Sequence, residues 1–79
     1  MAHNEAMATI RRYAVVLEPG ENGWIVVHFP AFPGCWTQGK TREEALANAR
    51  EALELTIESM VEEGEPLPQE DIEVLEVAV

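Results

Sequence analysis

The feature that most constrains this fold is one amphipathic helix that follows a series of short strands instead of alternating with them. Thr41 to Glu44 has the capping-box pattern, in which the threonine hydroxyl and the glutamate carboxylate each accept a hydrogen bond from a free backbone N–H. Gly64 stands where a helix end favours a left-handed residue, and Pro66 and Pro68 prevent continuation. The pattern predicts a helix of about twenty residues that begins at Thr41.

The predicted helix has an apolar face and a charged face. The apolar positions recur at helical spacing and are Ala45, Leu46, Ala49, Ala52, Leu53, Ile57, Met60 and Val61. The charged positions are Glu43, Arg50, Glu51, Glu54, Glu58 and Glu62. We expect the helix to cover one side of a sheet and to leave its glutamates in water.

Runs rich in β-forming residues precede the helix over 11–18, 24–29 and 35–38. The Pro19–Gly23 cluster joins the first two runs as a hairpin, and its Asn-Gly pair can supply positive φ. Pro30 and Pro33 interrupt the sheet before the third run, because proline cannot donate a ladder hydrogen bond. These short links predict an antiparallel meander.

The last run, residues 72–79, predicts a fourth strand, which a right-handed crossover would place parallel to the first. The expected fold class is therefore α+β, with the order β-β-β-α-β in a single domain over residues 11–79. Residues 1–10 are expected to form a disordered N-terminal tail. The first two strands are apolar on both faces, and one helix can cover only one of them. We expect a second subunit or a protein partner to cover the other face.

Small domains usually need a disulfide, a metal or an oligomeric partner. The single cysteine, Cys35, excludes an internal disulfide, and two histidines are too few for a structural zinc site. We therefore expect a homo-oligomer, either a dimer or a tetramer, without a cofactor. No signal-peptide pattern and no apolar run of membrane-spanning length are present, so a cytoplasmic location without membrane contact is expected.

The net charge of −10 disfavours direct binding to nucleic acid, because phosphate backbones would be repelled. Such a surface attracts a basic partner, although acidic residues can also serve solubility alone. A nucleophilic pair of Cys35 and His28, oriented by Asn48, is the weaker interpretation of those residues. A two-metal nuclease is disfavoured too, because several carboxylates would have to converge. The only aspartate, Asp71, follows the helix, the strands before the helix contribute only Glu18, and the helical glutamates lie on the solvated face. We predict a protein that is not an enzyme.

Aromatic residues gather around the loop between the second and third strands. Phe32 and Trp36 are candidate anchors for a partner, because aromatic side chains dominate interface hot spots. Trp24 and His28 share one strand face and are candidates for the same surface. The alternative is structural, in which the loop caps one end of the core and its prolines make it rigid.

Residues 29–46, with Pro33-Gly34-Cys35, Thr37-Gln38-Gly39 and Thr41-Arg42-Glu43-Glu44-Ala45, resemble the signature of the HicB-like antitoxin family. That signature is Pro-Asp-x-Pro-Gly-Cys, then Thr-x-Gly, then Thr-x-Glu-Glu-Ala opening a helix. Asn22-Gly23-Trp24 is similar to the family's hairpin, and residues 64–68 are similar to its Gly-x-Pro-x-Pro. The similarity spans residues 12–79.

The resemblance implies a partial ribonuclease-H-like fold that has lost its nuclease chemistry. It also implies self-association and binding to HicA, a small basic ribonuclease toxin. Two alternatives stay open: an orphan oligomeric domain that binds another protein, and a residual metal-dependent nuclease that uses Glu18 or Glu51. Ala31 departs from the family's usual acid. Full antitoxins often append a DNA-binding domain, so self-repression is not expected of a chain that stops at Val79.

Overall fold

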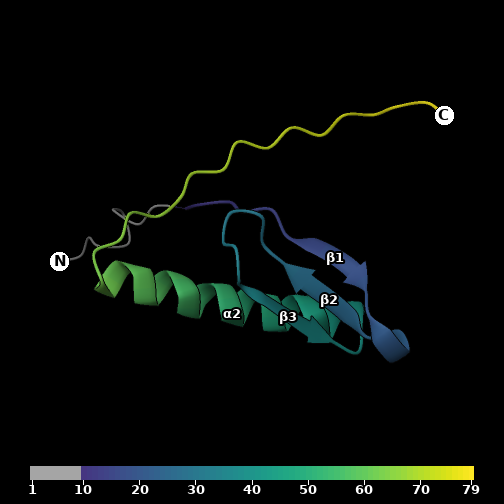
Figure 1. Cartoon of the computed structure of the whole chain (residues 1–79), viewed down its shortest axis with the longest axis horizontal. Helices are drawn as coiled ribbons and strands as arrows, with labels where there is room; N and C mark the ends of the chain where they lie inside the picture. The colour runs from purple at the N-terminus through teal and green to yellow at the C-terminus, as the bar shows by residue number, and fades with distance from the viewer. Residues whose placement is uncertain (1–9) are drawn as a thin grey trace.

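The computed structural model describes residues 10–79, and it contains a three-stranded sheet with one long helix along one side (Figure 1). The elements follow the order β1 (Val16–Pro19), η1 (Glu21–Gly23), β2 (Ile25–His28), β3 (Trp36–Gly39) and α2 (Arg42–Glu62). The predicted N-terminal tail lies outside the described residues except for its last residue, Ile10, which is exposed.

The sheet is the predicted antiparallel meander, with the strand order β1-β2-β3. Strand β1 is shorter than expected, because pairing stops at Val16 opposite His28. One residue further, the Phe29 carbonyl accepts a hydrogen bond from the Phe32 N–H (3.0 Å), so β2 turns away into the loop. Residues 11–15 therefore run beside the core without a ladder partner.

The hairpin turn has the backbone conformation that its Asn-Gly pair predicts. Asn22 and Gly23 both have positive φ, at 58° and 81°. The Gly20 N–H donates to the Trp24 carbonyl at 2.7 Å and closes the loop. The turn thereby sets the register in which Pro19 faces Ile25 and Glu18 faces Val26.

Helix α2 begins and ends where the sequence predicts. The Thr41 hydroxyl accepts a hydrogen bond from the Glu44 N–H at 3.0 Å, and the Glu44 carboxylate accepts one from the Lys40 N–H at 2.5 Å. At the other end Gly64, with φ of 74°, forms a Schellman motif: its N–H donates to Val61 and the Glu65 N–H donates to Met60. Local hydrogen bonds therefore fix both ends.

The core lies between α2 and one face of the sheet. Its buried residues are Val27, Phe29, Phe32, Ala45 and Ala49. Ala45 and Ala49 are small, which brings the helix close to the strands. The approach is closest at Gly39, where an added Cβ would lie 2.6 Å from Ala45 Cα and 2.9 Å from the Glu44 carbonyl carbon. The helix therefore covers one sheet face, as predicted, and the glutamates of its charged face are all exposed.

The expected fourth strand is not formed. Residues 65–79 have no regular secondary structure, and residues 71–79 are exposed throughout. The Glu70 carboxylate, and not the Glu70 backbone, accepts the Ala14 N–H at 2.6 Å, and the Tyr13 hydroxyl donates to the Pro68 carbonyl at 2.7 Å. A side chain inserted in this way holds the two backbones farther apart than the ~4.8 Å of paired strands. Beyond it the chain runs freely outward (Figure 1).

Candidate functional site

The sheet face turned away from α2 is the surface on which most of the predicted contact residues gather. Side chains alternate along each strand, so this open face consists of Val16, Glu18, Trp24, Val26, His28, Trp36 and Gln38. His28, the last residue of β2, lies at one end of this face, opposite Val16 on one side and Trp36 on the other. No helix of the described residues covers this face.

The two tryptophans give the open face its apolar character. Trp36 is 61% exposed, while Trp24 is half-buried beneath the Lys40 ammonium group, which lies 5.4 Å from the ring centroid. Between the two rings, Val26 and Gln38 form the floor of a shallow hollow whose end is the Gly20–Asn22 turn. A large exposed aromatic beside such a hollow is typical of a protein-binding surface.

His28 supplies a polar group at one end of the open face. Its Nε2 lies 3.8 Å from Glu18 Oε2, an ion pair only when the imidazole is protonated. Both side chains are substantially exposed, at 40% and 60%, so this contact adds little to stability. The pair instead gives the apolar face one donor and one acidic acceptor that a partner can engage.

Phe32 occupies a different place from the other three predicted contact residues. It is 4% exposed and packs edge-to-face on Tyr13, with ring centroids 4.8 Å apart and an interplanar angle of 73°. Its N–H donates to Phe29 and its carbonyl accepts from Cys35, both at 3.0 Å. Phe32 is thus an anchor of the loop that leads into Trp36, and the structural interpretation of the loop describes it better.

The residues of the hypothetical nucleophilic pair lie on opposite sides of the sheet. Cys35 is half-buried against the core and accepts a weak hydrogen bond from the Thr56 hydroxyl at 3.5 Å. His28 belongs to the open face. Asn48 donates to the Gln38 carbonyl at 2.9 Å and links α2 to β3. The three side chains therefore do not converge on a substrate.

The carboxylates do not converge either. Glu18 lies on the sheet, whereas Glu51 lies on the solvent side of α2, around Leu55 with Glu54 and Glu58. Across residues 10–79 no three His, Cys, Asp or Glu side chains come close enough together to hold a metal ion. A two-cation nuclease centre, which needs converging carboxylates, therefore has no counterpart in the part of the chain that is described.

The one long helix of residues 10–79, α2, is too polar to cross a lipid bilayer.

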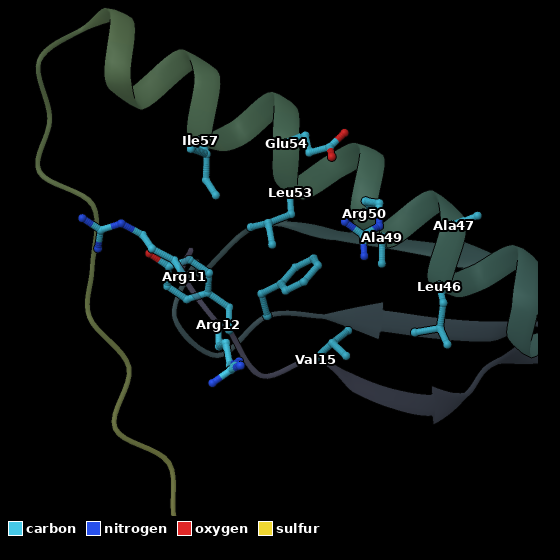
Figure 2. A pocket seen from close by; sticks show the side chains of 12 residues that line it. Arg11, Arg12, Val15, Leu46, Ala47, Ala49, Arg50, Leu53, Glu54 and Ile57 are labelled. Carbon is cyan, nitrogen blue, oxygen red and sulfur yellow. The ribbon is translucent and has the colours of Figure 1, made fainter. Parts of the chain in front are cut away.

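One further surface feature was missed by sequence reasoning. A groove of about 690 Å³ separates α2 from residues 11–15. Figure 2 shows Leu46, Leu53 and Ile57 pointing from the helix into this groove. Arg11, Arg12 and Arg50 also line it, so more than half of the chain's five basic residues are found there. Helical periodicity indicated the apolar floor, but the arginines come from two segments that only the fold brings together.

A three-stranded antiparallel meander backed by one helix, with two tryptophans on its open face, defines a small α+β domain. Comparison with known families assigns the domain to one of them. The chain belongs to the family described as HicB_like antitoxin of bacterial toxin-antitoxin system, whose model matches residues 13–78. The family therefore implies a toxin as partner and a role that is not enzymatic.

Individual relatives support the assignment. A UPF0150 protein of Thermoplasma acidophilum is 44% identical over 66 residues, which cover 84% of this chain and 96% of that protein. The protein named antitoxin HicB 1 of Photorhabdus laumondii is 49% identical over 57 residues, which cover 72% of this chain but only 37% of that protein. The present chain therefore matches less than half of that antitoxin.

A solved structure has the same fold. It is the crystal structure of the N-terminal domain of Burkholderia pseudomallei antitoxin HicB, at a TM-score of 0.62 and 26% sequence identity. The match covers 84% of this chain and 72% of that one. The resemblance that residues 29–46 carry is thus confirmed at the level of family and of fold class.

Proposed function

We propose that this chain neutralises a small basic ribonuclease toxin of the HicA type by binding it directly. Membership of the antitoxin family supports the role. The net charge of −10 supports the choice of a basic partner, because opposite charges speed the encounter of two proteins. We further propose that the protein acts in the cytoplasm as a homo-oligomer, a dimer or a tetramer, and that it does not bind nucleic acid itself.

The open sheet face is the proposed surface for the toxin, and the observation that carries this proposal is the exposure of Trp36. Trp36 is 61% exposed and lies on the same face as the half-buried Trp24 and His28. Tryptophan is enriched among the residues that contribute most to binding at protein interfaces. Trp24, His28 and Trp36 are the proposed contacts. Phe32 contributes indirectly, because its burial holds the loop before Trp36 in place.

The test is co-expression of the chain with its cognate toxin, followed by measurement of binding between the purified proteins. The informative variant is Trp36→Glu, and its matched control is Leu55→Glu on the solvent side of α2. Both residues are 61% exposed, so the two variants add the same charge at equal exposure. Loss of a hot-spot side chain weakens binding by about 30-fold or more, which is about 2 kcal/mol. We expect this loss for Trp36→Glu and near-normal binding and rescue of growth for Leu55→Glu.

The possible outcomes test the antitoxin role and the choice of the open face as the binding surface separately. Growth arrest that the wild-type chain does not relieve, with no complex between the purified proteins, would overturn the antitoxin role. Purification of the chain with copies of itself alone would then favour the orphan oligomer. Full binding by Trp36→Glu would remove the open face from the proposal and leave the role intact.

A further inference from the structure

The C-terminal arm, residues 71–79, leaves several large apolar side chains in water. Val74, Leu75 and Val77 are 85%, 83% and 76% exposed, although their residue types favour buried strands. The arm accounts for part of the large radius of gyration, 15.3 Å against the ~12 Å typical of a compact domain of this length. An exposed apolar segment of this kind marks an interaction site.

The groove beside α2 has the chemistry that this arm requires. Its floor is apolar, from Leu46, Leu53 and Ile57, and its charged lining is basic overall, with three arginines against Glu54 (Figure 2). The arm carries Asp71, Glu73 and Glu76 among its apolar residues. Acidic residues on an apolar strand therefore meet basic residues around an apolar groove. A basic toxin would meet the same arginines with unfavourable charge, so the groove and the open face suit different occupants.

The groove meets the open edge of the sheet at one end, because Val15, which lines the groove, directly precedes β1. Strand β1 pairs with β2 on one side only, which leaves its outer edge without a neighbouring strand among residues 10–79. A strand laid along that edge would direct alternate side chains toward α2. In the arm, Leu75, Val77 and Val79 share one face and are the residues suited to enter the groove.

Contacts just before residue 71 hold the chain's own arm away from this edge. The Glu70 carboxylate occupies the Ala14 N–H, and the Tyr13 hydroxyl fixes the Pro68 carbonyl. From this anchor the arm extends outward (Figure 1), over a length of about 30 Å at ~3.3 Å per residue. An arm from another molecule does not start from these contacts, so it can lie along residues 15–19 without displacing Glu70.

We propose that two copies of this chain exchange their C-terminal arms, so that residues 71–79 of each copy lie along β1 of the other and reach its groove beside Val15. A twofold axis makes the two contacts identical, and reciprocal exchange closes the assembly as a dimer. The inference does not depend on the antitoxin role, because it requires only copies of the chain itself.

The first test is the mass of the chain in solution, measured by light scattering and sedimentation without any toxin. The variant is Val77→Asp in the arm, and the matched control is Val61→Asp near the end of α2. Both valines are exposed, at 76% and 59%, so neither substitution disturbs the core. We expect a wild-type dimer, a rise of about 100-fold or more in the dissociation constant for Val77→Asp, since each dimer has two such contacts, and an unchanged dimer for Val61→Asp. A monomeric wild-type chain, or a Val77→Asp dimer as stable as wild type, would overturn the proposal.

A second test identifies which molecule the arm contacts. Two chains carry Cys35→Ser, and each has one new cysteine, Val79→Cys in the arm of one and Ala47→Cys in the groove of the other. After mixing, a short thiol cross-linker joins these two chains only if arms are exchanged. A cross-linked heterodimer is expected. Its absence, with an intrachain product from a single chain that carries both cysteines, would show that the arm docks on its own molecule and would refute the exchange.

Discussion

Replacement of Gly39 by alanine is expected to force helix α2 away from the sheet. The new Cβ would lie 2.6 Å from Ala45 Cα and 2.9 Å from the Glu44 carbonyl carbon. Both are backbone atoms in the first turns of α2, so no side-chain rotation can relieve the overlap. Carbon atoms make ordinary contact at about 3.5 Å or more, and the helix must therefore retreat by about 1 Å at this end.

The expected cost follows from that retreat. Overpacking of a well-packed core destabilises a protein by about 1–3 kcal/mol. The upper end applies here, because the atoms that overlap belong to rigid backbone and because the retreat also loosens the buried Ala45 and Ala49. A loss of about 3 kcal/mol lowers the folding equilibrium constant by about 150-fold. It removes a large part of the roughly 4–12 kcal/mol that a domain of this length has in total.

Urea unfolding followed by far-ultraviolet circular dichroism measures this effect. A loss of about 3 kcal/mol lowers the midpoint by about 2 M for a slope of about 1.5 kcal/mol/M. The series is repeated at several protein concentrations, because any oligomer makes the midpoint depend on concentration.

The control is Gly34→Ala. Gly34 has φ of 90° and no atom near an added Cβ, so its substitution costs only backbone strain of about 1–2 kcal/mol. If Gly39→Ala unfolds at the wild-type urea concentration, or costs less than Gly34→Ala, the packing argument is refuted.

Two further substitutions test the local contacts. Thr41→Ala removes the acceptor of the Glu44 N–H and should cost about 1 kcal/mol in the same urea assay, while Thr41→Ser should cost much less; equal losses would contradict a capping role. Phe32→Ala empties a buried site beside Tyr13 and should cost about 3–5 kcal/mol. A loss below 1 kcal/mol there would show that the loop is not part of the core.

The elements that the sequence predicted correctly are those decided by neighbouring residues. Thr41 and Gly64 set the ends of α2 through hydrogen bonds that span only a few residues. Asn22 and Gly23 determine the hairpin turn through their own positive φ. Alternation along β2 and β3 likewise predicts that Trp24, His28 and Trp36 share a face, because strand geometry has a period of two.

Phe32 shows why one predicted contact residue differs from the others. It belongs to a loop, and a loop has no period from which burial can be inferred. Its side chain turns inward because Tyr13, from the segment before β1, offers a ring to pack against, and because the Phe29 and Cys35 hydrogen bonds turn the backbone. Both causes arise from the fold and not from the residues around Phe32.

The C-terminal arm shows the same limit for a strand. Its residue types favour β structure, and that local preference is what predicted a fourth strand. A strand also needs an edge to pair with, and the contact between Glu70 and Ala14 decides whether the chain's own edge is within reach. No pattern within residues 72–79 carries that information. The groove arginines were missed for the same reason, since Arg11 and Arg50 meet only in the folded chain.

The groove and the open face carry different charges, so these two apolar surfaces suit different partners. The three arginines outnumber Glu54 in the groove, so it favours the acidic arm, while the open face carries Glu18 and Lys40 and has no such excess of positive charge. The two surfaces lie on opposite sides of the sheet, and occupation of one leaves the other accessible. Self-association and toxin binding should therefore be separable by mutation: Trp36→Glu should lose the toxin and keep the dimer, and Val77→Asp should lose the dimer and keep the open face. If instead either substitution abolished both properties, one surface would have to serve both partners.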